Sequence, residues 1–357
     1  MFRSEGRMTM RKFTLFMSAL VLVTVAQVSN AQTKIKIATL VPQNSSWAAT
    51  FRDGSREIDE RTEGRVILRF YWGGAQGNEK KILQKMKIGQ LHGGTFSPTD
   101  FQGSYPDVNI YGLPFFFANY DEVGYVREHM DANLQAGFFD LGYETFGFAG
   151  GGFAYILSNE PVASHADLIG KKVWLPQGDL ISYEAMKSLQ LSPVPLPLTD
   201  VLTGLQTGLI DIVAIPPIVA LALQWHTKVK YVTRIPVLYS IGFMAIDQRV
   251  MKKIGAADRQ ILTEVLTRIY ASFDAESESE AQAATAALLN VGVEEVELLS
   301  GEFGKIRGEM DATNKMMAEK GMFSLELLVE MEGHLAAFRS GQSKGQEPSG
   351  EPTGGAK

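Results

Sequence analysis

The sequence predicts an α/β protein of two lobes, with mixed β-sheets in each lobe and a long helix bridging both. Strand-like and helix-like segments alternate along most of the chain, which favours largely parallel pairing and helices covering the sheets. The chain has 357 residues, 45% of them hydrophobic, enough for more than one core. Helical character persists over 256–290, a length of roughly 50 Å, which exceeds one small lobe.

The first lobe is predicted to comprise residues 32–152 together with 245–275. Its strands mix alternating and continuous apolar residues, and its first helices follow capping residues and stop at glycines. Asn44, Ser45 or Ser46 can cap the first helix, and Asn78 the second. The predicted strands are 34–41, 66–72, 91–96 and two within 143–159; the predicted helices lie between the first three strands and at 121–137.

The second lobe is predicted to comprise residues 153–244 together with 276–339. Gly150 to Gly152 are the expected crossover into it, because consecutive glycines tolerate a sharp bend. Its predicted strands are 171–176, 193–198, 209–217 and 229–238, and a separate strand, 241–247, returns to the first lobe. Its predicted helices are 181–189, one from 199, 301–320 and 324–338. Residues 340–357, rich in Gly, Ser, Pro and Glu, are expected to be disordered.

Composition excludes several classes of function. The net charge is −6, the pI is about 5.5 and no basic stripe is present, so a nucleic-acid partner is not expected. The chain has no cysteine, which excludes disulfides, thiol catalysis and thiolate metal sites.

Residues 1–31 resemble a secretory signal peptide. Arg3, Arg7, Arg11 and Lys12 precede the apolar run 13–26, and Ser29 and Ala31 have the small-residue spacing of a cleavage site. The alternative, a membrane anchor, needs about 20 apolar residues, more than this run offers. The sequence therefore predicts export, cleavage after Ala31 and a soluble mature protein.

No catalytic or metal-binding constellation is evident. GQSKG at 341–345 matches the nucleophile-elbow pattern but lies in the predicted tail, and GGAQGNEKK lacks the residues of a phosphate loop. Of the five histidines, only His226 stands out, and a structural role is favoured for it. His92, His129, His165 and His334 show no ligand spacing with it or with one another. We therefore expect no enzyme activity, no cofactor and no metal.

Four segments carry a resemblance to a known family. They are ERTEGRVILRFYWGGAQGNEKKILQKMKIGQL, YGLPFFFANYDEV, SNEPVASHADLIGKKVWLP and SPVPLPLTDVLTGLQTGLIDIVAIPP. In their order and spacing, over residues 34–338, they resemble the substrate-binding proteins of tripartite ATP-independent periplasmic (TRAP) transporters, of the DctP type. The last segment matches the family's Leu-Gln-x-Gly-x-x-Asp signature.

The resemblance implies a periplasmic two-lobed binder that closes on a small molecule. It further implies delivery to a permease of small and large membrane subunits, driven by an ion gradient rather than ATP. A sensory module that presents its ligand to a membrane receptor is the alternative from another class, and an exported hydrolase is a third. Some relatives dimerise through the long helix, so a monomer and a homodimer both remain open.

The family's ligand-gripping positions have changed in this chain. Its arginine in the Lys-Ile-Arg-Val-Pro strand corresponds to Trp174, and a second arginine corresponds to Ala154. Its Glu-Asn pair before proline corresponds to Ala214 and Ile215. Because a buried carboxylate without a charged partner costs several kcal/mol, these changes predict an uncharged or largely apolar ligand, such as an aromatic one.

The resemblance places eleven candidate residues at the ligand. The apolar ones are Phe96, Phe153, Ala154, Trp174, Leu198, Ile215 and Pro216, and the neutral polar ones are Ser46, Asn78, Ser97 and Gln177. Two alternatives stay open. In the first, Trp174 packs as core or plugs the cleft and does not contact a ligand. In the second, the side chain of Arg234 or Lys230 reaches the cleft and holds an organic acid.

Overall fold

The computed structural model describes residues 32–345. The predicted signal peptide, 1–31, lies outside them. The tail was expected to be disordered from residue 340, and this boundary is wrong, because helix α11 (Leu325–Gly345) continues through residues 340–345. Among residues 32–345, no helix combines the length and the apolar character needed to cross a bilayer.

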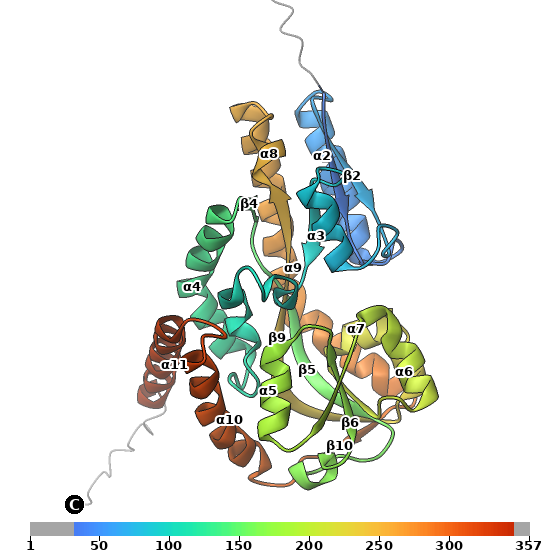
Figure 1. The fold of residues 1–357 in the computed structure, drawn as a ribbon, viewed down its shortest axis with the longest axis vertical. Coiled ribbons are helices and arrows are strands. Elements are labelled where there is room, and N and C mark those ends of the chain that lie inside the picture. Colours follow the sequence, from blue (N-terminus) through green and yellow to red (C-terminus); the bar gives the residue numbers. More distant parts are fainter. Residues whose placement is uncertain (1–31, 346–357) are drawn as a thin grey trace, which may run out of the picture.

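Lobe I, the upper lobe in Figure 1, is built on a mixed sheet in the order β2-β1-β3-β9. Strand β1 pairs in parallel with both β2 and β3, whereas β3 is antiparallel to β9. Ser45 caps the first helix and Asn78 the next, each by accepting a backbone N–H three residues on, as the sequence predicts. The elements are β1 (Thr33–Ala38), α2 (Ser46–Arg61), β2 (Val66–Tyr71), α3 (Glu79–Lys87), β3 (Gly93–Phe96), α4 (Tyr120–Asp140), β4 (Tyr143–Glu144) and α8 (Gln248–Met251).

Lobe II, the lower lobe, continues the sheet in the order β9-β5-β8-β6-β7. Strand β6 is parallel to β7 and β8, and β5 is antiparallel to β8 and β9. Helices cover both faces, so each lobe has its own apolar layers. The elements are β5 (Ala149–Ser158), β6 (Lys172–Pro176), α5 (Leu180–Ser188), β7 (Ser192–Leu196), α6 (Val201–Thr207), β8 (Ile212–Ile215), α7 (Pro217–Ala222), β9 (Tyr231–Asp247) and β10 (Glu294–Val296).

Two long strands cross between the lobes, where the sequence predicts breaks. The glycines 150–152 lie inside β5 as a bulge, with a register shift between Gly150 and Gly152 and φ of +83° at Gly152. The predicted strands 229–238 and 241–247 are one continuous strand, β9. Its Pro236 is accommodated in a second bulge, because the register against β5 jumps between Thr233 and Leu238.

Helix α9 (Ala256–Asn290) bridges the lobes, as the sequence predicts. It packs on α2 in lobe I and on β5 and α7 towards lobe II (Figure 1). Helix α10 (Glu302–Glu319) packs on α5, and α11 packs on α4. The shared strands and these helices join the lobes around the pocket described next.

Candidate ligand-binding site

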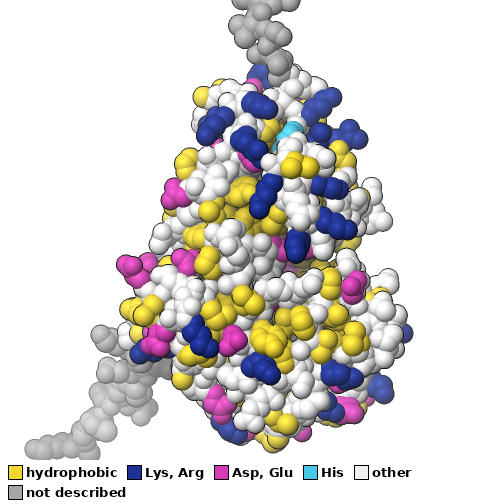
Figure 2. All heavy atoms as spheres, in the orientation of Figure 1, with side chains coloured by type: hydrophobic (Ala, Val, Ile, Leu, Met, Phe, Trp, Pro, Cys, Tyr) yellow, Lys and Arg dark blue, Asp and Glu magenta, His cyan; other side chains and the backbone are white. Residues whose placement is uncertain are grey.

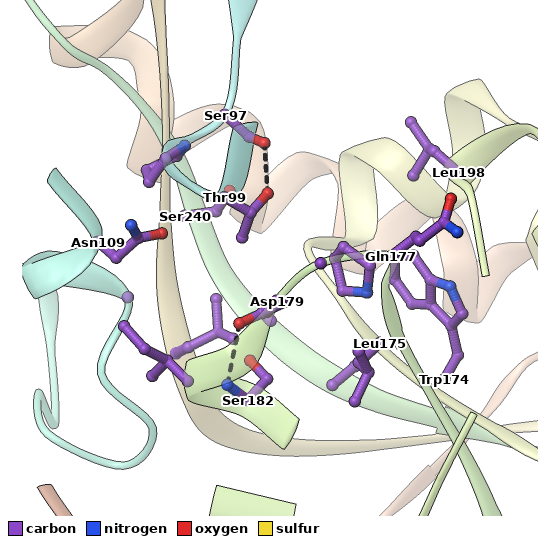
Figure 3. Close-up of a pocket in the computed structure, with 18 of the residues that line it drawn as sticks. Ser97, Thr99, Asn109, Trp174, Leu175, Gln177, Asp179, Ser182, Leu198 and Ser240 are labelled. Carbon is purple, nitrogen blue, oxygen red and sulfur yellow. Dashed lines mark hydrogen bonds between the residues drawn. The ribbon is translucent and has the colours of Figure 1, made fainter. Parts of the chain in front are cut away.

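A cavity of about 950 Å³ lies between the lobes. Its walls come from α3 and the turn after β3 on the lobe I side, and from β6, α5 and β8 on the lobe II side. The crossing strands β5 and β9 line it where they pass between the lobes. This volume is near the upper end of the ~300–1,000 Å³ typical of small-molecule sites. In Figure 3, side chains from both lobes surround the open space.

The structure places eight of the eleven predicted residues in the wall of this cavity. These are Asn78, Ser97, Ala154, Trp174, Gln177, Leu198, Ile215 and Pro216. The other three do not line it. Phe96 and Phe153 are buried in aromatic packing, Phe96 against Phe101 and Phe153 against Tyr120 and Tyr239. Ser46 is the exposed first residue of α2.

Trp174 forms part of the wall but is chiefly a packed residue. Its side chain is buried, at 2% exposure, and its ring meets Trp225 edge-on at 5.2 Å. Its indole N–H donates to the Leu196 carbonyl at 3.0 Å, so its single donor is already used. Figure 3 shows the indole at the edge of the cavity, beyond Gln177.

Three carboxyl groups that the sequence analysis did not single out also line the cavity. Asp100 accepts hydrogen bonds from the Ser97 N–H and hydroxyl, and Asp179 accepts the Ser182 N–H as the cap of α5. Burial, aided by the nearby charge of Glu79, raises the pKa of Asp100 to about 7. Burial also raises the pKa values of Asp179 and Glu79. The Ser-x-x-Asp spacing of 97–100 signals a capping box, but not a position in a pocket.

The cationic groups at the cavity are two lysines of α3. Lys80 and Lys87 are exposed and line it, and no arginine belongs to the lining formed by residues 32–345. Arg234 and Lys230, the two basic residues that the sequence offers as alternative partners for an acid, do not line the cavity. Arg234 pairs instead with Glu295 at 3.3 Å. Figure 2 shows Lys and Arg side chains gathered over the upper lobe and apolar side chains exposed around the middle and lower part.

One side of the cavity enters the apolar core of lobe II. There the wall includes buried aliphatic side chains on β5, β6, β8 and α5, on the turn before β6 and directly after α5. We call this part of the cavity the α5 arm; its lining includes Ile156, Leu168, Val173, Ala185, Leu189 and Ile212. Sequence reasoning missed these residues because their pattern is that of ordinary core.

Two further findings concern the chemistry of the site. His226, the histidine noted in the sequence, lies outside the lining, and a ring nitrogen is 3.4 Å from the Ala220 carbonyl. Within the described part of the chain, no cluster of three or more His, Asp or Glu side chains is placed to hold a metal ion. The site thus offers hydrogen-bonding groups and apolar surface.

Comparison with protein families gives one match over most of the chain. The model of the bacterial extracellular solute-binding proteins, family 7 (DctP), matches residues 37–320. A solute-binding protein of Verminephrobacter eiseniae is 25% identical over 64% of this chain and 69% of its own length. The 2,3-diketo-L-gulonate-binding periplasmic protein of Escherichia coli is 25% identical over 43% of this chain. The chain spans 47% to 69% of the length of these two curated relatives.

Solved structures share the fold. A TRAP periplasmic solute-binding protein of Desulfovibrio salexigens with bound orotic acid superimposes with a TM-score of 0.78 and 18% identity, covering 86% of this chain and 99% of that one. One from Haemophilus influenzae with bound L-gulonate gives 0.78 and 18%, covering 85% and 100%. One from Sulfurospirillum deleyianum with bound succinate gives 0.77 and 17%, covering 85% and 99%.

Proposed function

The chain belongs to family 7 of the bacterial extracellular solute-binding proteins, and we propose that it binds an uncharged or largely apolar small molecule and passes it to a TRAP permease. The family consists of solute-binding proteins of transporters, not of enzymes. The proposed site is the cavity between the lobes. The observation that carries the ligand class is its lining, which is mainly apolar and contains no arginine among residues 32–345.

Electrostatics support the exclusion of acids. A bound carboxylate would meet Asp100, Asp179 and Glu79 in the same cavity. Repulsion from those of these carboxyl groups that are ionised, and the loss of hydration, would each oppose its binding. An uncharged group meets neither cost. It finds hydrogen-bonding partners in Ser97, Thr99 and Gln177, which the cavity wall presents (Figure 3).

The relatives solved with orotic acid, L-gulonate and succinate hold acids. At 17–18% identity they share the fold with this chain, and the ligand class depends on the lining. The resemblance assigns the family's arginine positions to Trp174 and Ala154, and both residues are buried. An acid would have to be held by Lys80 or Lys87 on α3, where each ammonium is exposed and screened by solvent.

A paired ligand panel tests the ligand class. The purified protein is titrated calorimetrically with benzyl alcohol and benzoate, with benzamide as a second neutral partner, and with succinate, orotate and L-gulonate. We expect the neutral aromatic molecules to bind at least tenfold more tightly than benzoate. Tight binding of any of these acids would overturn the neutral-ligand proposal. Loss of that binding in Lys80→Met or Lys87→Met would assign it to the cavity, and the exposed neighbour variant Lys81→Met is the control that should retain it.

Native mass spectrometry of the protein as it leaves the producing cell identifies what the cavity carries. We expect a neutral, mainly apolar molecule to co-purify. Uptake into vesicles that contain the reconstituted permease subunits distinguishes transport from a sensory role. A transport protein stimulates this uptake, and a sensory module does not.

Export depends on the N-terminal segment. We propose that residues 1–31 direct the chain to the periplasm and are removed after Ala31. N-terminal sequencing of the protein recovered from the periplasm should begin at Gln32. Recovery of the uncleaved chain in the membrane fraction would favour an anchor instead.

A further inference from the structure

The α5 arm is lined by side chains of the lobe II core. Val173, Leu189 and Ile212 are only 4%, 3% and 2% exposed, yet all three line the cavity. Protein interiors are close-packed, with few voids larger than a water molecule. An apolar space that reaches into a core therefore loses dispersion contacts on every wall unless something fills it.

The surroundings of the arm suit hydrocarbon better than water. The side chains named for the α5 arm are aliphatic and carry no polar group to hold an ordered water, which needs two to four partners. Dry cavities lined by aliphatic side chains take up apolar molecules. At the entrance, Leu180 lines the cavity while remaining 53% exposed, so an apolar surface runs from the rim inwards.

The rest of the cavity lining has a different chemistry. Ser97 and Thr99 on the lobe I side and Gln177 on the lobe II side offer neutral hydrogen-bonding groups, and the carboxyl groups of Asp100 and Asp179 line the lobe I and lobe II walls respectively. The neutral groups can donate to or accept from a hydroxyl or amide, whereas the carboxyl groups disfavour an anion. The cavity lining therefore combines neutral hydrogen-bonding groups with a hydrocarbon-like region.

We propose that the ligand is an amphiphile whose hydrocarbon segment occupies the α5 arm and whose uncharged hydrogen-bonding head lies near Ser97, Thr99 and Gln177. This inference rests on the proposed solute-binding function and narrows its ligand class. It assigns a second role to Ala185 on α5 and to Leu189 directly after it, because these two side chains set how long a chain the arm accepts. Helix α10 packs on α5 and supports that wall.

A chain-length series tests the proposal. Straight-chain primary alcohols from 1-hexanol to 1-dodecanol are titrated by displacement of the uncharged fluorophore N-phenyl-1-naphthylamine. Each added methylene should tighten binding about fourfold while it is buried, until the arm is full and the gain stops. The carboxylate of each length should bind at least tenfold more weakly than the alcohol.

Substitutions in the α5 arm should change the longest alcohol for which an added methylene still increases affinity. Ala185→Phe narrows the arm and should make this limiting alcohol shorter. Leu189→Ala enlarges the arm and should make the limiting alcohol longer. Lys187→Phe is the matched control on the exposed face of α5 and should leave the series unchanged. The opposite directions separate an effect on the arm from general destabilisation. Leu189→Ala alone decides the matter if Ala185→Phe does not fold.

Three outcomes would overturn the inference, and they differ in what they leave of the proposed function. If short neutral molecules bind but affinity does not depend on chain length, the amphiphile is wrong and the neutral solute-binding function stands. If chain length matters but neither α5 variant moves the limit, the hydrocarbon lies elsewhere in the cavity. Binding of acids alone would overturn the proposed neutral ligand as well.

Discussion

Asp100 serves two purposes at the residue scale, since it closes the turn after β3 and faces the pocket. Its carboxylate accepts two hydrogen bonds from Ser97, at 2.8 Å and 2.9 Å, which favour the ionised form. Burial outweighs them and raises the pKa of Asp100 from 3.8 to about 7. The folded chain therefore holds a proton at this site that the unfolded chain has already released at pH 5.

This linkage predicts how stability varies with pH. Because the folded-state pKa is raised, the contribution of Asp100 is fully present below about pH 4 and is lost as pH rises through 7. Between pH 5 and 7 the loss corresponds to roughly 2 kcal/mol. Asp100→Asn should remove this part of the pH dependence. Urea unfolding of both proteins at pH 5, 6, 7 and 8 measures it, and parallel curves would contradict the assignment.

Trp174 provides a second prediction at the residue scale, because its N–H and ring are committed to lobe II. Trp174→Phe loses the bond to the Leu196 carbonyl, which still accepts the Gln177 N–H at 3.2 Å. We therefore expect a loss of only about 1–2 kcal/mol in unfolding free energy. The affinity for the best-binding alcohol should change less than twofold. A tenfold loss of affinity at unchanged stability would instead make the indole a direct ligand contact.

The sequence predicted several residues that line the pocket but not the buried aliphatic residues of the α5 arm. Ser97, Gln177 and Ile215 were predicted by their place in a matched segment, and they line the cavity. Val173 and Leu189 were not, because an aliphatic residue facing a void has the same sequence pattern as one facing another side chain. Phe96 and Phe153 were expected at the ligand but do not line the cavity. Their rings pack against other aromatic side chains, Phe96 against Phe101 and Phe153 against Tyr120.

At the scale of elements, helices with capping residues were predictable and the long strands were not. Ser45 and Asn78 mark helix starts by local hydrogen bonds that the sequence alone specifies. Pro236 and the glycines 150–152 are local breakers, and yet β5 and β9 run through them. The reason is non-local: each strand is held along its length by the other, and bulges absorb the irregular residues.

The junction of α4, β5 and α9 depends on one buried arginine. Arg127 on α4 pairs with Asp274 on α9 and with Asp131, and donates to the Phe148 carbonyl at 2.8 Å. Asp274 also accepts the N–H of Gly150 at 3.0 Å. One ion-pair network thus ties the bridging helix to the bulge in β5 where the chain passes between the lobes.

Breaking this network should be costly. The Arg127 side chain is 7% exposed, and Arg127→Met leaves the carboxylates of Asp131 and Asp274 without this cationic partner. We expect a loss of about 3–5 kcal/mol in the free energy of unfolding by urea. The control is Arg56→Met, which removes a pair to Asp53 whose side chains are 67% and 70% exposed. That change should cost less than about 1 kcal/mol, and equal losses in the two variants would contradict the assigned role of Arg127.

At the scale of the whole molecule, the sequence predicted the number of lobes and the bridge between them, but not how firmly they are joined. The period of the apolar residues in 256–290 suffices to predict a helix longer than one lobe. The continuity of β9 from lobe II into lobe I depends on its pairing with β5 and β3, which no local pattern records. Two strands and α9 are therefore shared by both lobes, although each lobe keeps apolar clusters of its own.

This sharing predicts that the lobes unfold together, and the four tryptophans allow a test. Trp47 and Trp72 pack in the core of lobe I, and Trp174 and Trp225 pack in that of lobe II. Two double variants, each with one pair replaced by Phe, leave fluorescence reporters in a single lobe. In each variant the urea midpoint from fluorescence should coincide with that from circular dichroism, as a two-state transition requires. If the reporters of one lobe change before the dichroism signal does, that lobe unfolds on its own and the shared strands do not couple the two.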